Sequence, residues 1–314
     1  MPHTVAVTGA TGFIGPHIVG RLRADGWQVR ILTRRPTLDP ALVGPEVEAV
    51  PGALEDQDSL VRLVEGADAV VHVAGLVKAR SRTAFFRGNA DSVGRLATIA
   101  AAAPRPPRFI LMSSLAAREP QLSAYAASKR AGEQALIGAS DRLRWTILQP
   151  PAVYGPGDRA TLPFFRCMAR GFGPVLGSAD ARISLIHAQD LANAVGVLLA
   201  DDRGAGLVAE IDDGHGGYRW RDMVETAAGA FGRAARVLPI PKAIPYGLGC
   251  LNLLLAHLPG YTPMLTPGKV REIYHRDWVC DSGPIMTRTS WRPMMPLSEG
   301  FAVTIAWYRQ HGWL

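Results

Sequence analysis

Tyr125 and Lys129, in the segment Ser123-Ala-Tyr-Ala-Ala-Ser-Lys129, are the residues whose types and spacing suggest chemistry most directly. Residues four apart on a helix lie on the same face, one turn above the other. An ammonium group next to a phenol favours the phenolate, so it lowers the pKa of the tyrosine and lets the hydroxyl exchange a proton near neutral pH. The pair would serve a reaction that moves hydride to or from a carbon bearing oxygen. Because such pairs are also common on helix surfaces, a second signal is needed.

That second signal lies near the N-terminus, where an apolar run from Val5 to Val7 leads into a glycine-rich turn. Glycines at 9, 12 and 15 would allow a tight turn, close approach of the backbone to a pyrophosphate, and close packing of a helix on a strand. The apolar spacing after the turn predicts a helix, whose N-terminus would offer N–H groups and a positive dipole end to phosphates. The pattern therefore favours dinucleotide binding over a glycine-rich turn without a ligand.

The elements that must position these residues alternate between strand and helix through the first half of the chain. This alternation is typical of an α/β fold with a doubly wound parallel sheet. After Pro150 the segments become irregular, and one more strand and helix follow from Ile183. We predict strands near 4–8, 28–33, 47–50, 69–73, 108–113 and 145–149, and helices near 13–25, 57–65, 89–103 and 124–138.

These elements predict two domains. A dinucleotide-binding domain would cover residues 1–150, with 183–212 returning to it. A smaller, mainly helical C-terminal domain over 151–182 and 213–314 would bind the substrate.

The composition is that of a globular protein with a large core, because 48% of the 314 residues are hydrophobic. Strand signals begin at residue 4, so no signal peptide is expected and the expected location is the cytoplasm. The three cysteines lack metal-ligand spacing, and no other cluster suggests a metal. The net charge of +7 is spread along the chain without a nucleic-acid-binding motif, so no nucleic-acid partner is predicted.

The most apolar segment runs from Ile244 to Leu258 and is interrupted by one proline and two glycines. A transmembrane helix needs about 20 apolar residues, so this segment is too short to span a bilayer. Three interpretations remain open: a core helix, a contact in a homodimer, and a surface that meets an apolar substrate or the inner face of a membrane. In the third case the segment should be partly exposed.

Together, these motifs resemble those of the extended short-chain dehydrogenase/reductase family, which includes nucleotide-sugar epimerases and 3β-hydroxysteroid dehydrogenases. The matching motifs occur in the family's order. They are Thr8-Gly-Ala-Thr-Gly-Phe-Ile-Gly15, Val71-His-Val-Ala-Gly75, Asn89, Met112-Ser-Ser114, Tyr125 with Lys129, Pro150-Pro-Ala-Val-Tyr-Gly-Pro156 and Ile186-His-Ala-Gln-Asp190-Leu-Ala192. The resemblance implies a Rossmann fold, an NAD(P) cofactor and a small-molecule substrate, and it weakens beyond residue 215.

The resemblance also implies roles for individual residues. Ser114, with Ser113 as the alternative, would hydrogen-bond the substrate oxygen. Tyr125 would be the acid/base, and Lys129 would hold the nicotinamide ribose while lowering the tyrosine pKa. His187 and Asp190 would be structural. The cofactor would contact Gly9, Thr11, Gly12, Phe13, Ile14, Gly15, Arg34, Ala74, Gly75, Tyr125, Lys129, Pro150 and Val153.

Two positions depart from the family pattern. Where the family often has Gly-Asp-Leu after the third strand, with the aspartate near the adenine, this chain has Gly52-Ala-Leu54. At the end of the second strand it reads Thr33-Arg34-Arg35, where an NAD-preferring enzyme usually has an acidic residue for the ribose hydroxyls. Since an arginine suits a 2′-phosphate, NADP is the predicted cofactor, with NAD as the alternative. The other interpretation of Arg34 is a solvated residue at the strand end.

The predicted function is an NADP-dependent oxidoreductase that interconverts a ketone and a secondary alcohol on an apolar substrate, such as a 3-keto-steroid or a 3-keto-sphingolipid. One alternative is a nucleotide-sugar epimerase or dehydratase, which commonly keeps NAD tightly bound. The other is a non-catalytic cofactor-binding scaffold, such as the dehydrogenase-like accessory subunit of respiratory complex I. The presence of Ser114, Tyr125 and Lys129 argues against the scaffold, because such proteins tend to lose the tyrosine or the lysine.

Overall fold

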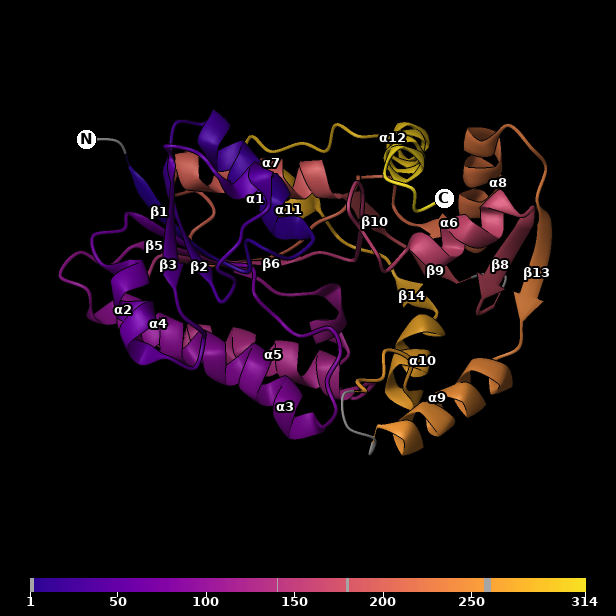
Figure 1. Cartoon of the computed structure of the whole chain (residues 1–314), viewed down its shortest axis with the longest axis horizontal. Coiled ribbons are helices and arrows are strands. Elements are labelled where there is room, and N and C mark those ends of the chain that lie inside the picture. The colour runs from indigo at the N-terminus through magenta and orange to yellow at the C-terminus, as the bar shows by residue number, and fades with distance from the viewer. Residues whose placement is uncertain (1–2, 140, 179–180, 257–260) are drawn as a thin grey trace. The chain divides into compact units, whose positions relative to one another are not determined.

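The computed structural model describes residues 3–139, 141–178, 181–256 and 261–314, which form two compact units (Figure 1). Unit 1 comprises Met1–Gln149, Leu191–Glu210 and Gly283–Arg292, and unit 2 comprises Pro150–Asp190, Ile211–Ser282 and Pro293–Leu314. Besides Pro150 and residues 211–212, which belong to unit 2, these boundaries differ from the predicted domains in two longer stretches. Residues 183–190 belong to unit 2, and residues 283–292 belong to unit 1.

Unit 1 is built on a seven-stranded parallel sheet in the order β11-β6-β5-β4-β1-β2-β3. Residues 5–7 of its central strand are fully buried, because helices cover both faces of such a sheet. The six strands predicted for this sheet are present, with ends within one residue of the predicted ones. Its strands are β1 (Thr4–Thr8), β2 (Gln28–Thr33), β3 (Val47–Pro51), β4 (Ala69–His72), β5 (Arg108–Met112), β6 (Trp145–Gln149) and β11 (Leu207–Glu210).

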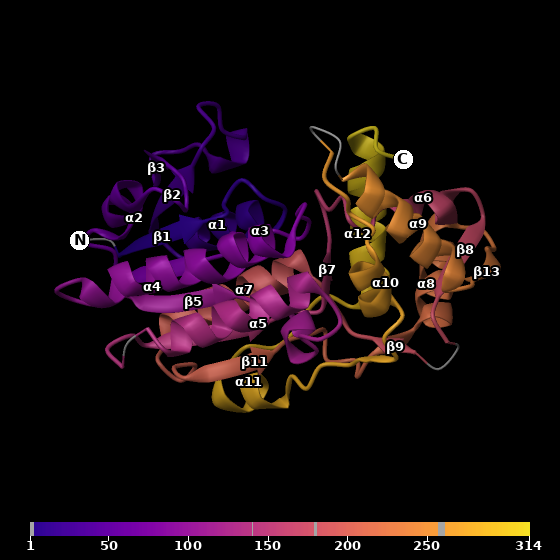
Figure 2. The same cartoon turned by 90° about the horizontal axis from the view of Figure 1, so that it is seen from below.

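Helices lie on both faces of this sheet. One face carries α1 (Ile14–Ala24), α7 (Ala188–Ala200) and α11 (Gly283–Arg288), and the other carries α2 (Gln57–Val64), α4 (Ser92–Ala102) and α5 (Ala124–Ile137) (Figures 1 and 2). On the second face, Leu60, Leu96 and Leu136 pack in one buried cluster with strand residues such as Phe109. The doubly wound α/β fold predicted from the sequence is therefore confirmed.

Shorter helical pieces precede two of these helices. The chain forms α3 (Arg82–Phe86) and one π-helical turn (Arg87–Asp91) before α4, so the helix predicted near 89–103 begins at Ser92. Turns of 3₁₀ helix occupy Pro40–Leu42 and Leu115–Arg118, the second directly before the loop that leads to α5.

Unit 2 was expected to be mainly helical, but it also contains short strands. The strand predicted to begin at Ile183 is present as Arg182–Ile183 and Leu185–His187. The others were not predicted, because strands of two to five residues leave little periodic pattern in a sequence. Its aromatic core is formed by side chains such as Tyr154, Phe165 and Phe301. Its elements are β7 (Ala152–Tyr154), α6 (Leu162–Ala169), β8 (Phe172–Leu176), β9 (Arg182–Ile183), β10 (Leu185–His187), β12 (Tyr218–Arg219), α8 (Trp220–Phe231), β13 (Arg236–Ile240), α9 (Ala243–Leu255), α10 (Pro267–Ile273), β14 (Asp277–Trp278) and α12 (Leu297–Gln310).

No helix in the described parts of the chain is long and apolar enough to cross a membrane.

Candidate active site and cofactor-binding loop

The strand order of unit 1 reverses at β1, since β2 lies on one side of it and β4 on the other. Ligands of open α/β sheets bind at the carboxyl ends of the strands at such a point. The glycine-rich loop begins there, directly after β1, and passes over the end of β4. The amide of Val73 donates to the Thr8 carbonyl at 3.1 Å, which fixes the two strand ends side by side.

Gly9 and Gly15 are required by this geometry. Gly9 has a φ of +76°, a conformation that L side chains rarely adopt, and a Cβ there would lie 2.5 Å from the amide nitrogen of Ala74. A Cβ on Gly15 would collide with the carbonyl oxygens of Gly9 and Ala10. The amide of Gly12 closes the turn by donating to the Gly9 carbonyl at 3.1 Å. The loop can therefore lie this close to the strand ends only with glycine at these positions.

The N-terminus of α1 is left without a side-chain cap. Phe13 precedes the helix and offers no capping hydrogen bond, and the first turn carries no acidic residue. Pro16 is the third residue of the helix, where a missing N–H group costs little. The N–H groups of a helix start need acceptors, and phosphate oxygens supply them. The loop from Gly9 through Thr11 and Ile14 thus fits the pyrophosphate of a dinucleotide.

The chain after β4 leaves room for a lysine from α5. A Cβ on Gly75 would lie 3.0 Å from the Lys129 Nζ and 3.1 Å from the Asn89 Oδ1. Asn89 holds the same loop, because its Oδ1 accepts from the Leu76 amide at 2.6 Å and its Nδ2 donates to the Leu76 carbonyl at 2.9 Å. Its Nδ2 also donates to the Ser128 Oγ at 2.9 Å, which ties the loop to α5.

Tyr125 and Lys129 lie in the first two turns of α5, as their spacing predicted. Ser123 caps this helix by accepting from the Ala126 amide at 3.0 Å. Tyr125 is half-buried with its ring 6.1 Å from that of Phe85, whereas Lys129 is buried and donates from Nζ to the Met112 carbonyl at 2.9 Å. That carbonyl is the one acceptor of Lys129 in the described segments. An ammonium group has three donors, so two remain for hydroxyl groups such as those of a ribose.

Burial lowers the pKa of Lys129 to about 8, and the negative charge of Glu133 opposes this shift. Nearby, burial and secondarily the Lys129 charge lower the pKa of His72 to about 3. The neutral His72 ring is held by Thr8, whose Oγ1 lies 2.8 Å from the His72 Nδ1. The lysine is thus a cation that can lose its proton slightly above neutral pH.

Glu133 is a residue of this region that sequence reasoning missed. It is 1% exposed, and its Oε1 accepts from the Ser113 Oγ at 2.5 Å and from the Gln149 Nε2 at 2.7 Å. These bonds join α5 to the chain just after β5 and to the end of β6. Its position four residues after Lys129, on the same helix face, is the signal that would have found it.

The two serines after β5 differ in what their hydroxyl groups do. The Ser113 hydroxyl donates to Glu133, so its hydrogen is committed. Ser114 is half-buried, and its Oγ accepts from the Ala116 amide at 3.2 Å while its hydrogen reaches no acceptor within the residues described. Of the two, Ser114 is therefore the one able to donate a hydrogen bond to a ligand.

The end of β2 presents two exposed arginines. Arg34 and Arg35 follow Thr33, whose Oγ1 accepts from the Arg35 amide at 3.0 Å. Neither guanidinium has an ion-pair partner in the parts of the chain that are described. The neighbouring Gly52-Ala-Leu54 loop, where the family often has an aspartate, is held by Arg95, which donates to the Leu54 carbonyl at 2.5 Å. This edge therefore offers two cations without ion-pair partners among the described residues, and it has no carboxylate at the position where the family often has the aspartate.

Two of the predicted cofactor contacts belong to unit 2. Pro150 directly follows β6, and Val153 lies in β7 opposite Ile186 of β10. His187 ends β10, and Asp190 accepts from the amides of Met294 at 3.1 Å and Met295 at 2.9 Å. The cofactor contacts expected of Pro150 and Val153 stay predictions.

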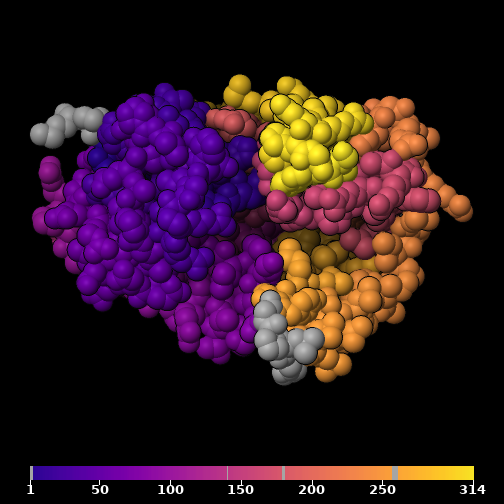
Figure 3. Space-filling model, in the orientation of Figure 1, coloured from indigo at the N-terminus to yellow at the C-terminus, as the bar shows by residue number. Residues whose placement is uncertain are grey.

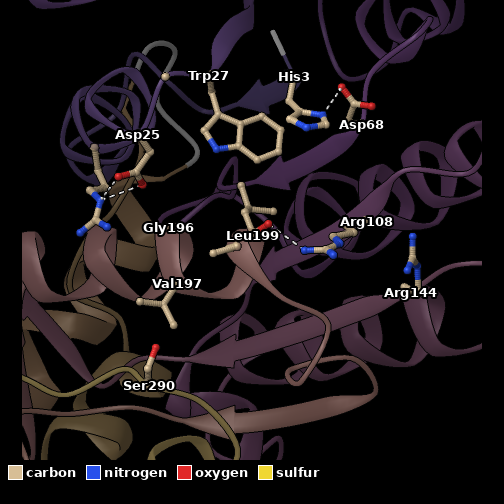
Figure 4. A pocket seen from close by; sticks show the side chains of 13 residues that line it. His3, Asp25, Trp27, Asp68, Arg108, Arg144, Gly196, Val197, Leu199 and Ser290 are labelled. Atoms are coloured by element: carbon tan, nitrogen blue, oxygen red, sulfur yellow. Dashed lines mark hydrogen bonds and ion pairs between the residues drawn. The ribbon is translucent and has the colours of Figure 1, made fainter. Parts of the chain in front are cut away.

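A hollow of about 660 Å³ in unit 1 lies away from these residues (Figure 4). It is lined by Trp27, Asp68, Arg108 and Arg144, which stand at or just before the starts of β2, β4, β5 and β6. Arg108 and Arg144 both pair with Asp202. The hollow is therefore at the amino-terminal edge of the sheet, opposite the glycine loop. Among the described residues no group of three or more metal-binding side chains occurs.

The lowered pKa of Lys129 predicts a pH-dependent effect on stability. In cofactor-free protein, the unfolded lysine binds a proton between about pH 8 and pH 10.5 while the folded one has lost it, so stability rises with pH in that window. Lys129→Met lacks this contribution. As the pH rises from about 8 to about 10.5, the unfolding free energy of the unsubstituted protein should therefore increase by about 3 kcal/mol relative to that of Lys129→Met. Denaturant titrations at several pH values test this, and a pH-independent difference would contradict the buried cation.

Residues 5–208 match the model of the NAD dependent epimerase/dehydratase family. The chain belongs to this family and is an NAD(P)-dependent oxidoreductase of the extended short-chain dehydrogenase/reductase type, as its motifs suggested. It is 42% identical to the ceramide reductase of Caulobacter vibrioides over 99% of this chain and 96% of that protein.

Two further similarities are more distant. The chain is 28% identical to the NADH dehydrogenase 1 alpha subcomplex subunit 9 of Arabidopsis thaliana, over 62% of this chain and 50% of that protein. A UDP-glucose 4-epimerase of Thermus thermophilus, solved in complex with NAD, superposes with a TM-score of 0.74 at 23% identity, covering 98% of this chain and 99% of that one. The second similarity bears on the fold alone.

Proposed function

We propose that the protein is an NADPH-dependent reductase of a long-chain keto-lipid of the 3-keto-sphingolipid class. The observation that carries the proposal is the 42% identity to a ceramide reductase along nearly the whole of both chains. The site supports it, because Tyr125, Lys129 and a serine hydroxyl able to donate all occur at the carboxyl edge of the unit 1 sheet.

In this proposal the hydride for the carbonyl carbon would come from the reduced nicotinamide when it is bound. Ser114 donates a hydrogen bond to the carbonyl oxygen, and this bond strengthens as negative charge develops there. Tyr125 donates its proton to the same oxygen, so that a secondary alcohol forms. Lys129 donates to the ribose hydroxyls and, as a cation, favours the tyrosinate that remains. Glu133 acts as a positioning residue, since it holds α5 against the ends of β5 and β6.

The direct test combines purified protein and NADPH with a 3-keto-sphingolipid, with and without an N-acyl chain, and identifies the product by mass spectrometry. Conversion of the ketone to the alcohol with oxidation of NADPH is the expected result. UDP-glucose serves as the comparison substrate. Tightly held NAD released from the purified protein, together with epimerisation of UDP-glucose, would instead support the nucleotide-sugar alternative.

The preference for NADP is proposed from Arg34, an exposed cation without an ion-pair partner among the described residues. A guanidinium forms charge-assisted bonds to a phosphate, which are about twice as strong as neutral ones. Arg34→Asp should therefore reverse the preference, weakening NADPH binding and strengthening NADH binding by about tenfold or more each. Dissociation constants for both nucleotides give the ratio. Arg62→Asp, an exposed arginine of α2, is the matched control, and an equal ratio in both variants would make Arg34 a solvated residue.

A non-catalytic scaffold is the other alternative, and the Arabidopsis complex subunit gives it a distant relative. The intact Tyr125 and Lys129 argue against it. The role of unit 2 in binding the substrate remains a prediction.

A further inference from the structure

We propose that helix α9 docks this protein on the surface of an anionic phospholipid bilayer, with its outer face entering the boundary between headgroups and acyl chains. The sequence left this segment open as core, dimer contact or lipid-facing surface. In the structure it is a helix on the surface of unit 2, in the orange part of Figure 3. The last two residues of the predicted segment, 257 and 258, lie outside the described residues.

The outer face of α9 is apolar and exposed. Leu254 is 68% exposed, Ile244 57%, Leu248 53% and Leu251 52%. Tyr246, Leu253 and Leu255 are also exposed, and no residue from 243 to 255 is charged. Large contiguous apolar surfaces of this kind mark interaction sites rather than ordinary protein surface.

The inner face of the same helix is held firmly. Gly249 is its one buried residue, and a Cβ there would lie 2.9 Å from the Thr266 carbonyl carbon and 3.0 Å from the Pro267 nitrogen, at the start of α10. Asn252, the polar side chain that points inward, donates to the Leu265 carbonyl at 3.1 Å and accepts from the Tyr261 hydroxyl at 3.0 Å. One face of α9 is therefore packed on α10, which lies beside it in Figures 1 and 2, while the leucines of the other face are exposed.

The charged residues next to α9 indicate which partner its apolar face would contact. From the chain that enters α9 to the turn after α10, residues 241–276 contain four basic side chains and one acidic side chain, namely Lys242, Lys269, Arg271 and Arg276 against Glu272. Glu272 is buried and paired with Lys269 at 2.7 Å, so the exposed charge of this region is positive. Lys242 directly precedes α9, and Arg271 lies on α10 beside it. An apolar helix face with basic flanks is the pattern of interfacial helices that bind anionic lipids.

A second copy of this chain is the less favourable occupant. Two copies that met through α9 would bring the same basic residues together, and like charges across an interface oppose association. An anionic bilayer satisfies both features, since the acyl chains cover the leucines and the headgroups attract the cations. The inference does not depend on the proposed keto-lipid substrate.

The test measures binding of the full-length protein to sedimenting vesicles. Phosphatidylcholine vesicles containing phosphatidylglycerol should bind it, high salt should weaken binding, and pure phosphatidylcholine should bind much less. Leu251→Gln with Leu254→Gln should lower the partition coefficient at least about tenfold, because two exposed leucines no longer enter the apolar layer. Lys242→Gln should lower it about fivefold. The matched controls are Val303→Gln on α12 for the leucine variant and Arg62→Gln on α2 for the lysine variant. Both should leave the partition coefficient unchanged.

A second measurement covers the case in which the leucine variant folds poorly. Cys250 is the exposed cysteine of α9, and Cys167 and Cys280 are less accessible. An environment-sensitive dye on Cys250 should shift to the blue with anionic vesicles, and labelled Cys250→Ser should not. Equal binding of wild type and leucine variant to vesicles, or no binding by either, would overturn the proposal. A wild-type dimer that the leucine substitutions convert to monomer, without vesicle binding, would assign α9 to a second copy instead.

Discussion

Tyr125→Phe is expected to lower the turnover of the keto-lipid by about 10²–10⁴-fold, because it removes one transferable proton and little else. Tyr125 is half-buried and contacts Phe85 through its ring, which phenylalanine retains. Fold and NADPH affinity should therefore stay unchanged. Steady-state rates with NADPH, together with a dissociation constant and a melting temperature, separate lost chemistry from lost structure.

Thr98→Val provides the control, since Thr98 is an exposed residue of α4 in unit 1 and this substitution also removes a hydroxyl group and little else. It should leave the turnover number unchanged. A Tyr125→Phe enzyme that reduces the ketone at close to the normal rate would remove the acid/base role from Tyr125. A lowered turnover that came with a lowered melting temperature would point instead to misplaced packing around α5.

The sequence predicted the sheet of unit 1 well because its strands are apolar runs buried on both faces. Val5 to Val7 is such a run, and the observed strand ends at Thr8 as expected. Spacing was equally informative for Tyr125 and Lys129, since it placed them one turn apart on the same helix without any knowledge of the fold. In both cases a local pattern carries the structural information.

Contacts between distant segments were harder to predict. The spacing of Glu133 from Lys129 marks its helix face, but its importance comes from Ser113 and Gln149, which the sheet brings to it. The same applies to residues 283–292, whose return to unit 1 follows no local signal. The choice between Ser113 and Ser114 likewise required knowing which hydroxyl was already engaged.

The apolar segment shows a third limit. Periodicity could not separate a core helix from a surface helix, because α9 is apolar on nearly all sides. The structure separates them through the exposure of Leu254 and the burial of Gly249. The partial exposure expected of a lipid-facing or substrate-facing segment is therefore observed, which rules out a core helix within unit 2.

The glycine loop gives the second large effect. Gly9→Ala should lower the free energy of unfolding by about 2–5 kcal/mol. The alanine would have to keep a positive φ, and its Cβ would lie 2.5 Å from the Ala74 amide nitrogen. The three atoms nearest to this Cβ are backbone atoms of Val73 and Ala74, so no flexible side chain can move aside. The loop must shift from the strand ends, so affinity for NADPH should fall by about 100-fold as its N–H groups leave their positions.

Gly20→Ala is the matched control, since Gly20 lies on α1 of the same unit and a Cβ there meets nothing within 4 Å. Alanine is the better helix former, so this variant should gain about 0.5–1 kcal/mol and bind NADPH normally. Denaturant titration and nucleotide binding on both variants give the comparison. If Gly9→Ala bound NADPH as tightly as Gly20→Ala, the pyrophosphate would have to be held elsewhere than on the loop between β1 and α1.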